Sequence, residues 1–458
     1  MKVTAALAEF SAGLGAHSIP RPVLDNALLA ISDSIGTVFA GLDQTSVRLI
    51  REAAMREGAA GPATVMGTGM TSSATAAALA NGSAAHALDY DNISLTVSGF
   101  IGSPTLFALL ALAEASDQPI GGTQLLEAYV AGWEAAAAIA RGLGVLHYSK
   151  GWHATATIGH FGAAIGGARL LGLDPDRTRS AIGIAASEAS GLRTMIGNMT
   201  NPFHVGKAAR NGVLAAQLAA AGFEAERDVI EHPFGVAVAF NGRDGFDLSA
   251  MTQGLGERWD LVDPGLVVKV YPCCGLIHSS IDAVLDLRQT LSIEPGDVAE
   301  VEVAVHALVP PTMKFDRPAT GYEAKFSTPF CIASALRHGA VRLEHFSDVH
   351  TRDRDIQDLM GRVTMVVHPD LMESSTFLER EFSEVRITLR DGSAHSRRVA
   401  RISNRGSRGR PADRALIRDK IEDCIAGQPN AERLRVGFDM LERLETVDDV
   451  REIMVYLK

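Results

Sequence analysis

The sequence has few cysteines and no arrangement of them that suits a metal site. Of the four cysteines in 458 residues, Cys273 and Cys274 are adjacent, Cys331 and Cys424 stand alone, and no C-x-x-C spacing occurs. Structural zinc sites and iron–sulfur clusters need several cysteines at short spacings, so we expect no metal. So few cysteines also suit a reducing compartment, and we expect a cytoplasmic protein.

Positive charge is also in short supply. The chain has 43 Lys and Arg against 54 Asp and Glu, a formal net charge of −11. Surfaces that bind nucleic acid or anionic membranes need an excess of Lys and Arg, so we expect neither as the main partner. A pocket on an acidic protein can still be locally basic, so a small acidic ligand remains open.

Long apolar runs are absent. The most apolar stretch, near residues 105–114, is soon followed by Glu114 and Asp117, whereas a membrane span needs roughly 20 apolar residues. The N-terminal residues MKVTAALAEF have one lysine and an early Glu9, and no apolar signal-peptide core follows. The sequence therefore predicts neither a membrane span nor a signal peptide.

Several catalytic motifs are missing as well. The sequence contains no G-x-x-x-x-G-K-[ST], no H-E-x-x-H and no G-x-S-x-G. Its glycine-rich stretches do not follow a strand, as the phosphate-binding loop of a dinucleotide-binding domain must. Nucleotide, zinc-peptidase and serine-hydrolase chemistry are not indicated.

The residues that are present predict a mostly helical N-terminal domain over residues 1–264. Hydrophobic residues make up 47% of the chain and charged residues 21%, which is typical of a folded protein. Alanine, glycine, leucine and isoleucine recur at helical spacing, over 26–40, 75–88, 104–115, 122–142, 153–171, 176–188 and 207–222. The several glycines in 153–171 predict close approach of neighbouring helices, because each lowers helix propensity by up to about 1 kcal/mol.

The pattern changes after Pro264. Residues 299–308, 363–368 and 384–389 alternate or are rich in β-branched side chains, and Asp391-Gly392 indicates a hairpin. Helical stretches at 276–291 and 327–337 interleave with them, which predicts a smaller α+β domain over 265–410. The basic run 398–410 is expected to be a solvated loop. Helical periodicity returns over 411–458, and we expect this tail to pack on the N-terminal domain.

Four segments place polar side chains within otherwise apolar helical surroundings. In the first, Asp89 and Asp91 follow an alanine-rich helix. A carboxylate there can accept a proton or orient a histidine, or it can cap the next helix. In the second, Tyr148, Lys150 and His153 open a glycine-rich helix. They suit anion binding and proton transfer, unless His153 is a buried imidazole with a structural hydrogen bond.

The third segment, residues 198–210, contains Asn201, His204 and Lys207 at the expected start of a helix. Donors and cations at such a position suit a carboxylate ligand, although ordinary capping with a solvated Lys207 explains the same residues. The fourth contains Lys269 at the domain boundary, where an ammonium can bind a carboxylate or polarise a carbonyl. Cys273 as a nucleophile is a weaker alternative, because no neighbour in the sequence activates it.

These segments resemble the MmgE/PrpD family, and the resemblance covers essentially the whole chain. The matching stretches are HALDYD at 86–91, GWHATATIG at 151–159, residues 198–212, KVYP at 269–272 and EAKFS at 323–327. The resemblance implies a multi-domain protein with a large all-α domain, completed by the tail, a smaller α+β lid and a cleft between them. It further implies a homodimer that acts on a small carboxylate without metal or organic cofactor.

The resemblance also implies roles for residues in the cleft. Asp89, His153, His204 and Lys269 match residues of the family's cleft. On this basis we expect His153 to be the general base or acid, oriented by Asp89. Lys269 and His204 are expected to bind the carboxylate and stabilise developing negative charge. Tyr148 or Lys150 is expected to supply a second proton-transfer group.

Four usual family residues are replaced in this chain. Ile93 stands where threonine is common, with Ser94 beside it, and Phe100 aligns with a histidine. Asn201 replaces a lysine, and Phe330 falls where a tyrosine is typical. We expect Asn201, Ser94, Phe100 and Phe330 to contact substrate. Each lost charge-assisted contact costs about 1.5–3 kcal/mol, so the pocket is expected to favour fewer carboxylates than citrate carries.

Three functions are consistent with this pattern. The leading hypothesis is a cofactor-independent lyase, a dehydratase or a decarboxylase, that acts on a small di- or tricarboxylic acid. The first alternative is an epimerase or racemase of a dicarboxylate, with Tyr148 and His153 on one face of the substrate and Lys269 on the other. The second alternative is a catalytically silent binding protein of the same fold.

Overall fold

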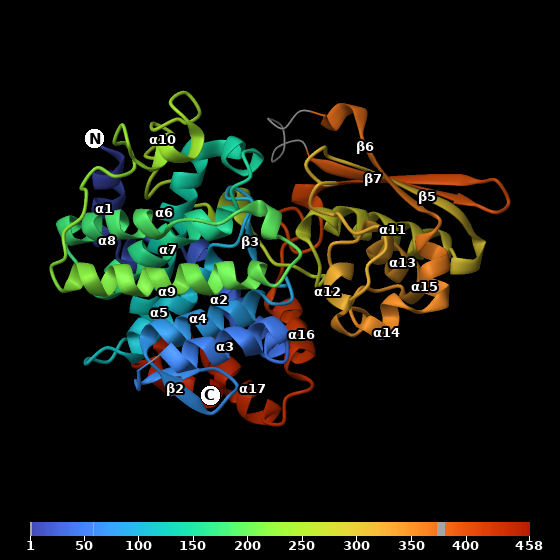
Figure 1. The fold of residues 1–458 in the computed structure, drawn as a ribbon. Coiled ribbons are helices and arrows are strands. Elements are labelled where there is room, and N and C mark those ends of the chain that lie inside the picture. The colour runs from blue at the N-terminus through green and yellow to red at the C-terminus, as the bar shows by residue number, and fades with distance from the viewer. Residues whose placement is uncertain (1, 58, 373–380) are drawn as a thin grey trace.

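A computed structural model describes residues 2–57, 59–372 and 381–458 and shows two domains joined near residue 268 (Figure 1). The N-terminal domain is a bundle of helices. Its helices are α1 (Val3–Gly13), α2 (Arg21–Gly41), α3 (Thr45–Glu57), α4 (Ala74–His86), α5 (Gly102–Glu114), α6 (Gly122–Ser149), α7 (Ala154–Leu170), α8 (Pro175–Glu188), α9 (Thr200–Ala220) and α10 (Val236–Asn241). Two short antiparallel ladders accompany them, β1 (Ala63–Val65) with β2 (Met70–Ser72), and β3 (Ile93–Ser94) with β4 (Leu266–Val267).

Glycines allow the central helices α6, α7 and α9 to approach one another closely. A Cβ atom at Gly132 of α6 would lie 2.4 Å from the carbonyl oxygen of Gly162 of α7. A Cβ atom at Gly212 of α9 would lie 2.3 Å from the Cβ of Ala163. No real side chain tolerates such distances. Within α7 itself, a Cβ atom at Gly166 would lie 2.9 Å from the Ala128 carbonyl oxygen, so the prediction that the glycines of α7 permit close packing is confirmed.

The second domain, which we call the lid domain, is built on a four-stranded sheet. Its elements are α11 (His278–Leu291), β5 (Val298–Val305), α12 (Gly321–Ala324), α13 (Thr328–His338), α14 (Asp348–Thr351), α15 (Arg354–Met360), β6 (Val363–Val367), β7 (Phe382–Leu389) and β8 (Ala394–Ala400). The strand order is β6-β5-β7-β8, with β5 and β6 parallel and the other pairs antiparallel. The lid domain has a hydrophobic core of its own, to which α11 and α13 contribute.

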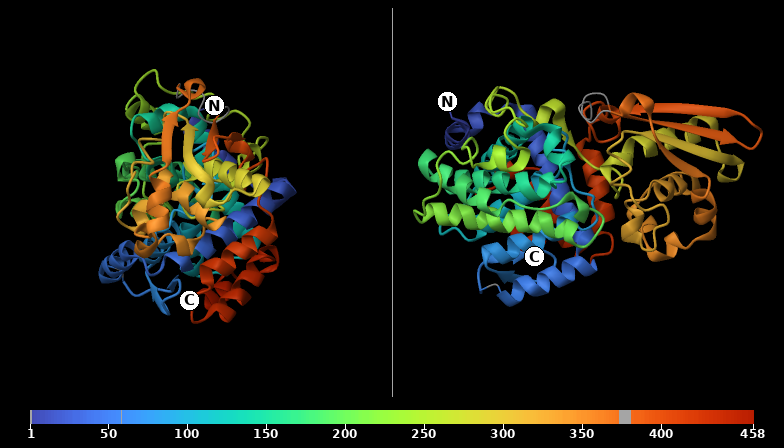
Figure 2. Two further views of the ribbon diagram at one scale, coloured as in Figure 1. Left: turned by 90° about the vertical axis from the view of Figure 1, so that its right-hand side faces the viewer. Right: turned by 45° about the horizontal axis from the view of Figure 1, so that its top comes forward.

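The tail returns to the helical domain. It forms α16 (Arg414–Ile425), α17 (Ala431–Leu441) and α18 (Arg451–Leu457), and α16 packs against α2. In the right-hand view of Figure 2 the tail, in red, lies along the helical domain on the side that faces the lid domain. Ile417 and Ile421 belong to the same hydrophobic core as Ile31 and Ile35 of α2. The tail is therefore part of the helical domain's core.

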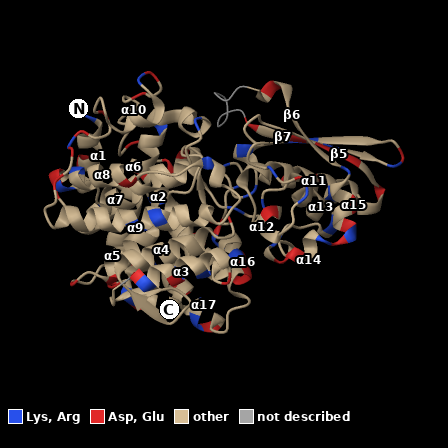
Figure 3. Cartoon of the chain, in the orientation of Figure 1, with Lys and Arg blue, Asp and Glu red and all other residues tan. Residues whose placement is uncertain are grey.

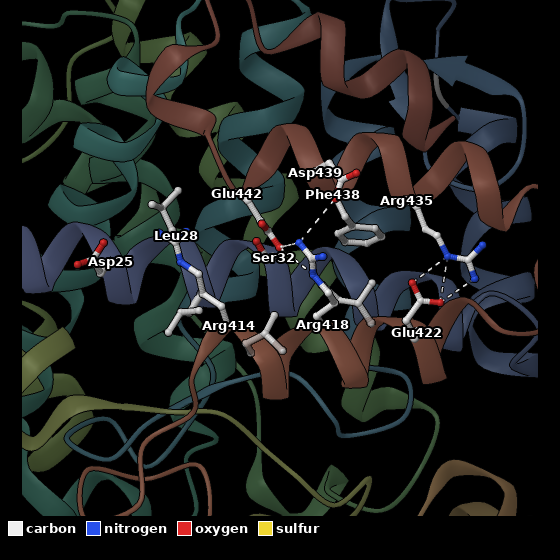
Figure 4. Close-up of a pocket in the computed structure, with 13 residues that line it drawn as sticks. Asp25, Leu28, Ser32, Arg414, Arg418, Glu422, Arg435, Phe438, Asp439 and Glu442 are labelled. Carbon is white, nitrogen blue, oxygen red and sulfur yellow. Dashed lines mark hydrogen bonds and ion pairs between the residues drawn. The ribbon is translucent and has the colours of Figure 1, made fainter.

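Charged side chains of the tail pair with one another. Figure 4 shows the groove between α2, α16 and α17, where Arg418 contacts Glu442 and Arg435 contacts Glu422. Figure 3 shows that the central helices carry few charged residues, whereas the lid domain and the tail carry many. Helix α2 is long and apolar enough to cross a membrane, but 78% of its apolar window is buried within the protein, as in a core helix.

The fold class predicted from the sequence is confirmed, with differences in detail. The hairpin at Asp391-Gly392 joins β7 to β8, and Gly392 has the positive φ of 88° that the turn requires. Strand β8 could not be predicted, because most of its side chains are exposed and no alternation of apolar and polar residues marks it in the sequence. Helix α9 begins at Thr200 rather than near 207, so Asn201 and His204 lie on the helix itself.

The contact between α6 and α7 yields a stability prediction. We expect Gly132→Ala to lower the free energy of unfolding by about 1–3 kcal/mol, because the overlap with the Gly162 carbonyl outweighs the gain in helix propensity. Urea unfolding followed by circular dichroism measures the change. Gly13→Ala in α1 is the matched control, since a Cβ there meets no atom within 4 Å. A gain in stability for both variants would contradict the packing argument.

Candidate active site

A buried ion pair forms the centre of a pocket between the two domains. The Lys269 Nζ lies 2.8 Å from the Asp89 Oδ1 and donates a hydrogen bond to the Asp89 carbonyl oxygen at 2.7 Å. Both side chains are almost inaccessible to water. Asp89 has a φ of +51°, a left-handed conformation that is strained for a residue with a side chain. Strain and a desolvated charge pair together are typical of a functional site.

A short ladder brings this pair together across 180 residues of chain. Strand β3 pairs with β4, with Ile93 opposite Val267 and Ser94 opposite Leu266. The ladder fixes the loop after α4, which carries Asp89, against the segment that carries Lys269.

The pocket encloses about 50 Å³ and is lined from both domains. Six residues predicted from the sequence line it: Asp89, Phe100, Tyr148, His153, Asn201 and Lys269. The Phe100 ring centre lies 4.7 Å from the Lys269 Nζ and 4.2 Å from the His86 ring. Phe100 therefore covers the ammonium with an aromatic face instead of supplying a proton donor.

His153 and His204 form a buried pair at the edge of the pocket. Their Nδ1 atoms lie 2.8 Å apart, so one ring carries its proton on Nδ1 and the other on Nε2. Burial, with the neighbouring histidines adding to it, lowers the pKa of His153 well below its usual value. Burial likewise lowers the pKa of His204 to about 4. Both imidazoles are therefore neutral at pH 7.

Tyr148 and Asn201 add two further polar groups. Burial raises the pKa of Tyr148, so the phenol keeps its proton at neutral pH, and the Arg193 guanidinium lies 4.2 Å from the ring centre. The Asn201 Oδ1 is buried without a hydrogen-bond partner among the described residues. Such an atom costs about 1–3 kcal/mol until a ligand supplies a donor.

The expectation that Asp89 orients His153 is wrong. The Asp89 carboxylate is paired with Lys269, and the hydrogen-bond partner of His153 is His204. Residues at the ends of different helices converge on one pocket, and sequence spacing does not show which of them pair.

Four residues expected to contact substrate do not line the pocket. His204 reaches it only through its hydrogen bond with His153. Ser94 follows Ile93 on a strand, so its side chain takes the opposite face and donates to Asp260. The Lys207 ammonium binds the carbonyl and hydroxyl oxygens of Ser190. Phe330 lies in the core of the lid domain, within an aromatic contact of Phe346.

Arg401, which was not predicted from the sequence, lines the pocket from the end of β8. The prediction of a solvated loop over 398–410 is wrong at its start, because residues 398–400 belong to β8, and Arg401 is only 6% exposed with its Nη1 2.5 Å from the Glu381 Oε2. The cysteines do not supply a nucleophile, because burial raises the pKa of Cys273 strongly and that of Cys274 to about 12.

Two further lysines, also missed, fix the backbone around the pocket. The buried Lys420 of α16 donates to the Tyr90 carbonyl oxygen at 2.6 Å and to the Lys269 carbonyl oxygen at 2.9 Å, and its third partner is the Asp33 Oδ1 at 2.6 Å. The buried Lys325 donates to the carbonyl oxygen of Pro272 at 2.7 Å. No sequence motif marks Lys420, whereas Lys325 lies within the family-like stretch EAKFS.

Comparison with known proteins decides the family. The sequence matches the MmgE/PrpD N-terminal domain over residues 5–249 and the MmgE/PrpD C-terminal domain over residues 271–445. The chain belongs to the MmgE/PrpD family. The match to the C-terminal domain extends over α16 and α17, although this MmgE/PrpD protein packs both helices on its N-terminal domain.

Similar proteins include several named for one reaction. The chain is 27% identical to a cis-aconitate decarboxylase of Aspergillus terreus over 476 residues, which covers 99% of this chain and 96% of the relative. It is 26% identical to a cis-aconitate decarboxylase-like protein of Aspergillus oryzae, with coverage of 99% and 97%. It is 23% identical to the cis-aconitate decarboxylase of Homo sapiens, with coverage of 84% and 79%.

The histidine pair of this MmgE/PrpD protein yields a pH prediction. The lowered pKa values mean that the pair gains a proton only in strong acid, so kcat/KM loses no activity through these groups between pH 8 and about pH 5.5. The unfolded chain takes up protons first below about pH 6.5, so the free energy of unfolding falls on acidification in the same range. Steady-state rates at 25 °C and thermal unfolding at each pH measure the two effects.

His204→Asn tests the assignment. His204 lowers the pKa of His153 by like-charge repulsion, so the variant should show its acidic loss of activity at a higher pH than the parent protein. His338→Asn in the lid domain provides the control for a lost imidazole elsewhere. An acidic limb near pH 6.5 in the parent protein would show that the titrating group is not this pair.

Lys420 yields a second prediction. Lys420→Met leaves the Asp33 carboxylate buried without its cation, and we expect a loss of about 3–5 kcal/mol in the free energy of unfolding. Adding Asp33→Asn should restore part of the loss, because the orphaned charge disappears. Arg418→Met, on the exposed face of the same helix, should cost at most about 1 kcal/mol. Urea unfolding of the four proteins tests these values, and equal losses for Lys420→Met and Arg418→Met would refute the assignment.

Proposed function

We propose that this protein is a carboxy-lyase that removes CO₂ from a small di- or tricarboxylic acid of the cis-aconitate type. The observation that carries the proposal is the buried pair of Lys269 and Asp89 in a pocket that also holds a neutral His153 and a protonated Tyr148. An ammonium shielded from water stabilises a developing negative charge far better than one in solvent. The cis-aconitate decarboxylase relatives support this class of reaction.

The proposed step balances with the groups of this pocket. The bond between carbon and one carboxylate breaks, and its electron pair passes into the conjugated system that ends in a second carboxylate. Lys269 stabilises the charge that develops there. Tyr148 gives its proton to the carbon that lost CO₂, and water returns a proton to the phenolate. His153 holds the second carboxyl group by a hydrogen bond.

Arg401 compensates in part for a replaced residue. Asn201 removes a cation that the family resemblance leads one to expect, while Arg401 brings one from the lid domain, paired with Glu381. The two formal cations of the pocket, Lys269 and Arg401, each face one carboxylate. Two cations favour a substrate that places two carboxylates in the pocket. This is a dicarboxylate, or a tricarboxylate whose third carboxylate lies outside the pocket.

Proton NMR of the purified protein in D₂O with cis-aconitate, 2-methylcitrate and iminodisuccinate tests the reaction class. We expect loss of CO₂ from cis-aconitate with one deuterium incorporated. Loss of water would instead indicate a dehydratase, and exchange at an α-carbon without net loss an epimerase, an activity that none of the relatives named above carries in its name. Thermal stabilisation by the acids without any product would indicate a binding protein.

Variants test the assigned residues. Lys269→Met should lower kcat by about 10²–10³, the usual effect of removing one stabilising donor. Lys207→Met is the matched control and should leave kcat unchanged, because its ammonium lies outside the pocket on Ser190. His153→Gln should also slow turnover. Equal activity of Lys269→Met and the parent protein would show that the charge develops elsewhere.

A further inference from the structure

A second cavity lies directly beside the catalytic pocket. It encloses about 540 Å³, against about 50 Å³ for the pocket at Lys269. Ser98 and Tyr148 line both, so the two spaces share a wall. The larger volume falls in the range of ligand-binding pockets, whereas the smaller one does not. We call this space the Arg141 cavity after one of its charged residues.

The part of the Arg141 cavity near Tyr148 is apolar. Its wall includes Val97, Val145, Ile158 and Ile402. The α6 chain bends here at Gly144, which has a φ of 61° and leaves open space where a Cβ would stand. The residues after this bend, among them Val145 and Tyr148, line the cavity, and an apolar chain of a ligand suits such a wall.

The remainder of the cavity carries an excess of positive charge. Arg141, Arg258 and Arg408 line it, and only Arg408 has an ion pair among the described residues, with Asp263. The Nε and Nη1 atoms of Arg141 are buried without a hydrogen-bond partner in the described structure. These two buried N–H donors of Arg141 can therefore donate hydrogen bonds to a carboxylate of a ligand.

The buried carboxyl groups of Glu134 and Asp260 interact electrostatically with Arg141 but do not fully neutralise the positive charge of the cavity. Glu134 and Asp260 lie next to each other, and burial and mutual repulsion raise the pKa of Glu134 to about 8. The pKa of Asp260 is raised as well, and its oxygens already accept bonds from Ser94, Thr96 and Trp133. The pair therefore holds at least one proton at neutral pH.

The groove between α2, α16 and α17 differs from the Arg141 cavity in the pairing of its arginines. Two of its three arginines, Arg418 and Arg435, are already paired with glutamates of the same groove, and Arg414 alone has no ion pair among the described residues (Figure 4).

We propose that the Arg141 cavity receives a remote arm of the substrate, apolar beside Tyr148 and ending in a second carboxylate at Arg141 and Arg258. This proposal rests on the proposed function, since the carboxylate held at Lys269 is the one that takes up the charge when CO₂ leaves. The substrate class is then an unsaturated di- or tricarboxylic acid whose last carboxylate stands on a chain of several methylene groups. Such an acid fills both spaces, whereas cis-aconitate fills only the smaller one.

A homologous series of acids tests the proposal. The reactive set is cis-pent-2-enedioates that carry carboxymethyl, 4-carboxybutyl, 6-carboxyhexyl or n-hexyl on the methylene carbon, so that loss of the carboxylate on this carbon leaves an electron pair conjugated with the other carboxylate. The saturated counterparts cannot react and are used for calorimetry. We expect the 6-carboxyhexyl compound to bind at least tenfold more tightly than the carboxymethyl compound, and the n-hexyl compound to lie between them.

Variants of the arginines locate the arm. Arg258→Met and Arg141→Met should each reduce the preference for 6-carboxyhexyl over carboxymethyl at least tenfold, both in Kd of the saturated acids and in kcat/KM of the reactive ones. Arg258 is exposed, so its variant is expected to fold even if that of Arg141 does not. Arg414→Met, which lines the groove of Figure 4, is the control and should leave the preference unchanged.

The outcomes separate this proposal from the proposed function. Tight binding of the long saturated acid that depends on Arg258, without decarboxylation of any reactive acid, supports the cavity and refutes the carboxy-lyase. Decarboxylation of cis-aconitate with equal affinity along the series refutes the cavity and supports the carboxy-lyase. A preference for long chains that neither arginine variant changes also refutes the cavity, because an apolar surface elsewhere then accounts for it.

Discussion

The removal of one ammonium from water organises the catalytic side of this molecule. Lys269 is fully buried, and a buried cation is tolerated only where oxygen atoms surround it. The Asp89 side chain and carbonyl oxygen provide two such atoms, and the Phe100 ring covers a third side. Each of these partners comes from a loop that follows or precedes a helix. The pair therefore exists only while α4, α5 and the segment after β4 keep their relative positions.

The tail secures those positions. Lys420 of α16 uses its donors on the backbone of Tyr90 and of Lys269 itself and on the Asp33 carboxylate. Two of these contacts are hydrogen bonds and the third is an ion pair, so the buried ammonium has three oxygen partners. The pocket thus depends on a helix more than 150 residues beyond Lys269 in the chain. Because Lys420 has to reach these oxygen atoms, α16 packs against α2 in the helical domain and not against the core of the lid domain, which precedes it in the chain.

Sequence reasoning located much of the site because its residues lie at the ends of helices. Apolar periodicity stops where Asp89, Tyr148 and His153 stand, and a polar residue in such a position is conspicuous. The helices themselves and the two-domain division followed from periodicity and from the change of composition after Pro264.

The pairing within the site was not accessible from the sequence. Asp89 is 180 residues from Lys269, and nothing local distinguishes that partner from His153. Arg401 lies in a basic run of the kind usually found in solvent, and only the tertiary fold buries it beside Glu381. The face of a side chain was equally hidden where the element was too short to show a period, as at Ser94 in the two-residue strand β3.

The residues that stand in place of usual family residues can be explained together when both cavities are considered. Phe100 and Ile93 make the space around Lys269 small and apolar, and Asn201 offers an amide with an unsatisfied oxygen instead of a cation. A small acid with three charges is poorly served by such a pocket. The positive charge missing there is present on the far side of Tyr148, at Arg141. Under the proposed remote arm, the charges at Lys269 and at Arg141 stand in neighbouring cavities, and the distance between them selects the length of the acid that satisfies both.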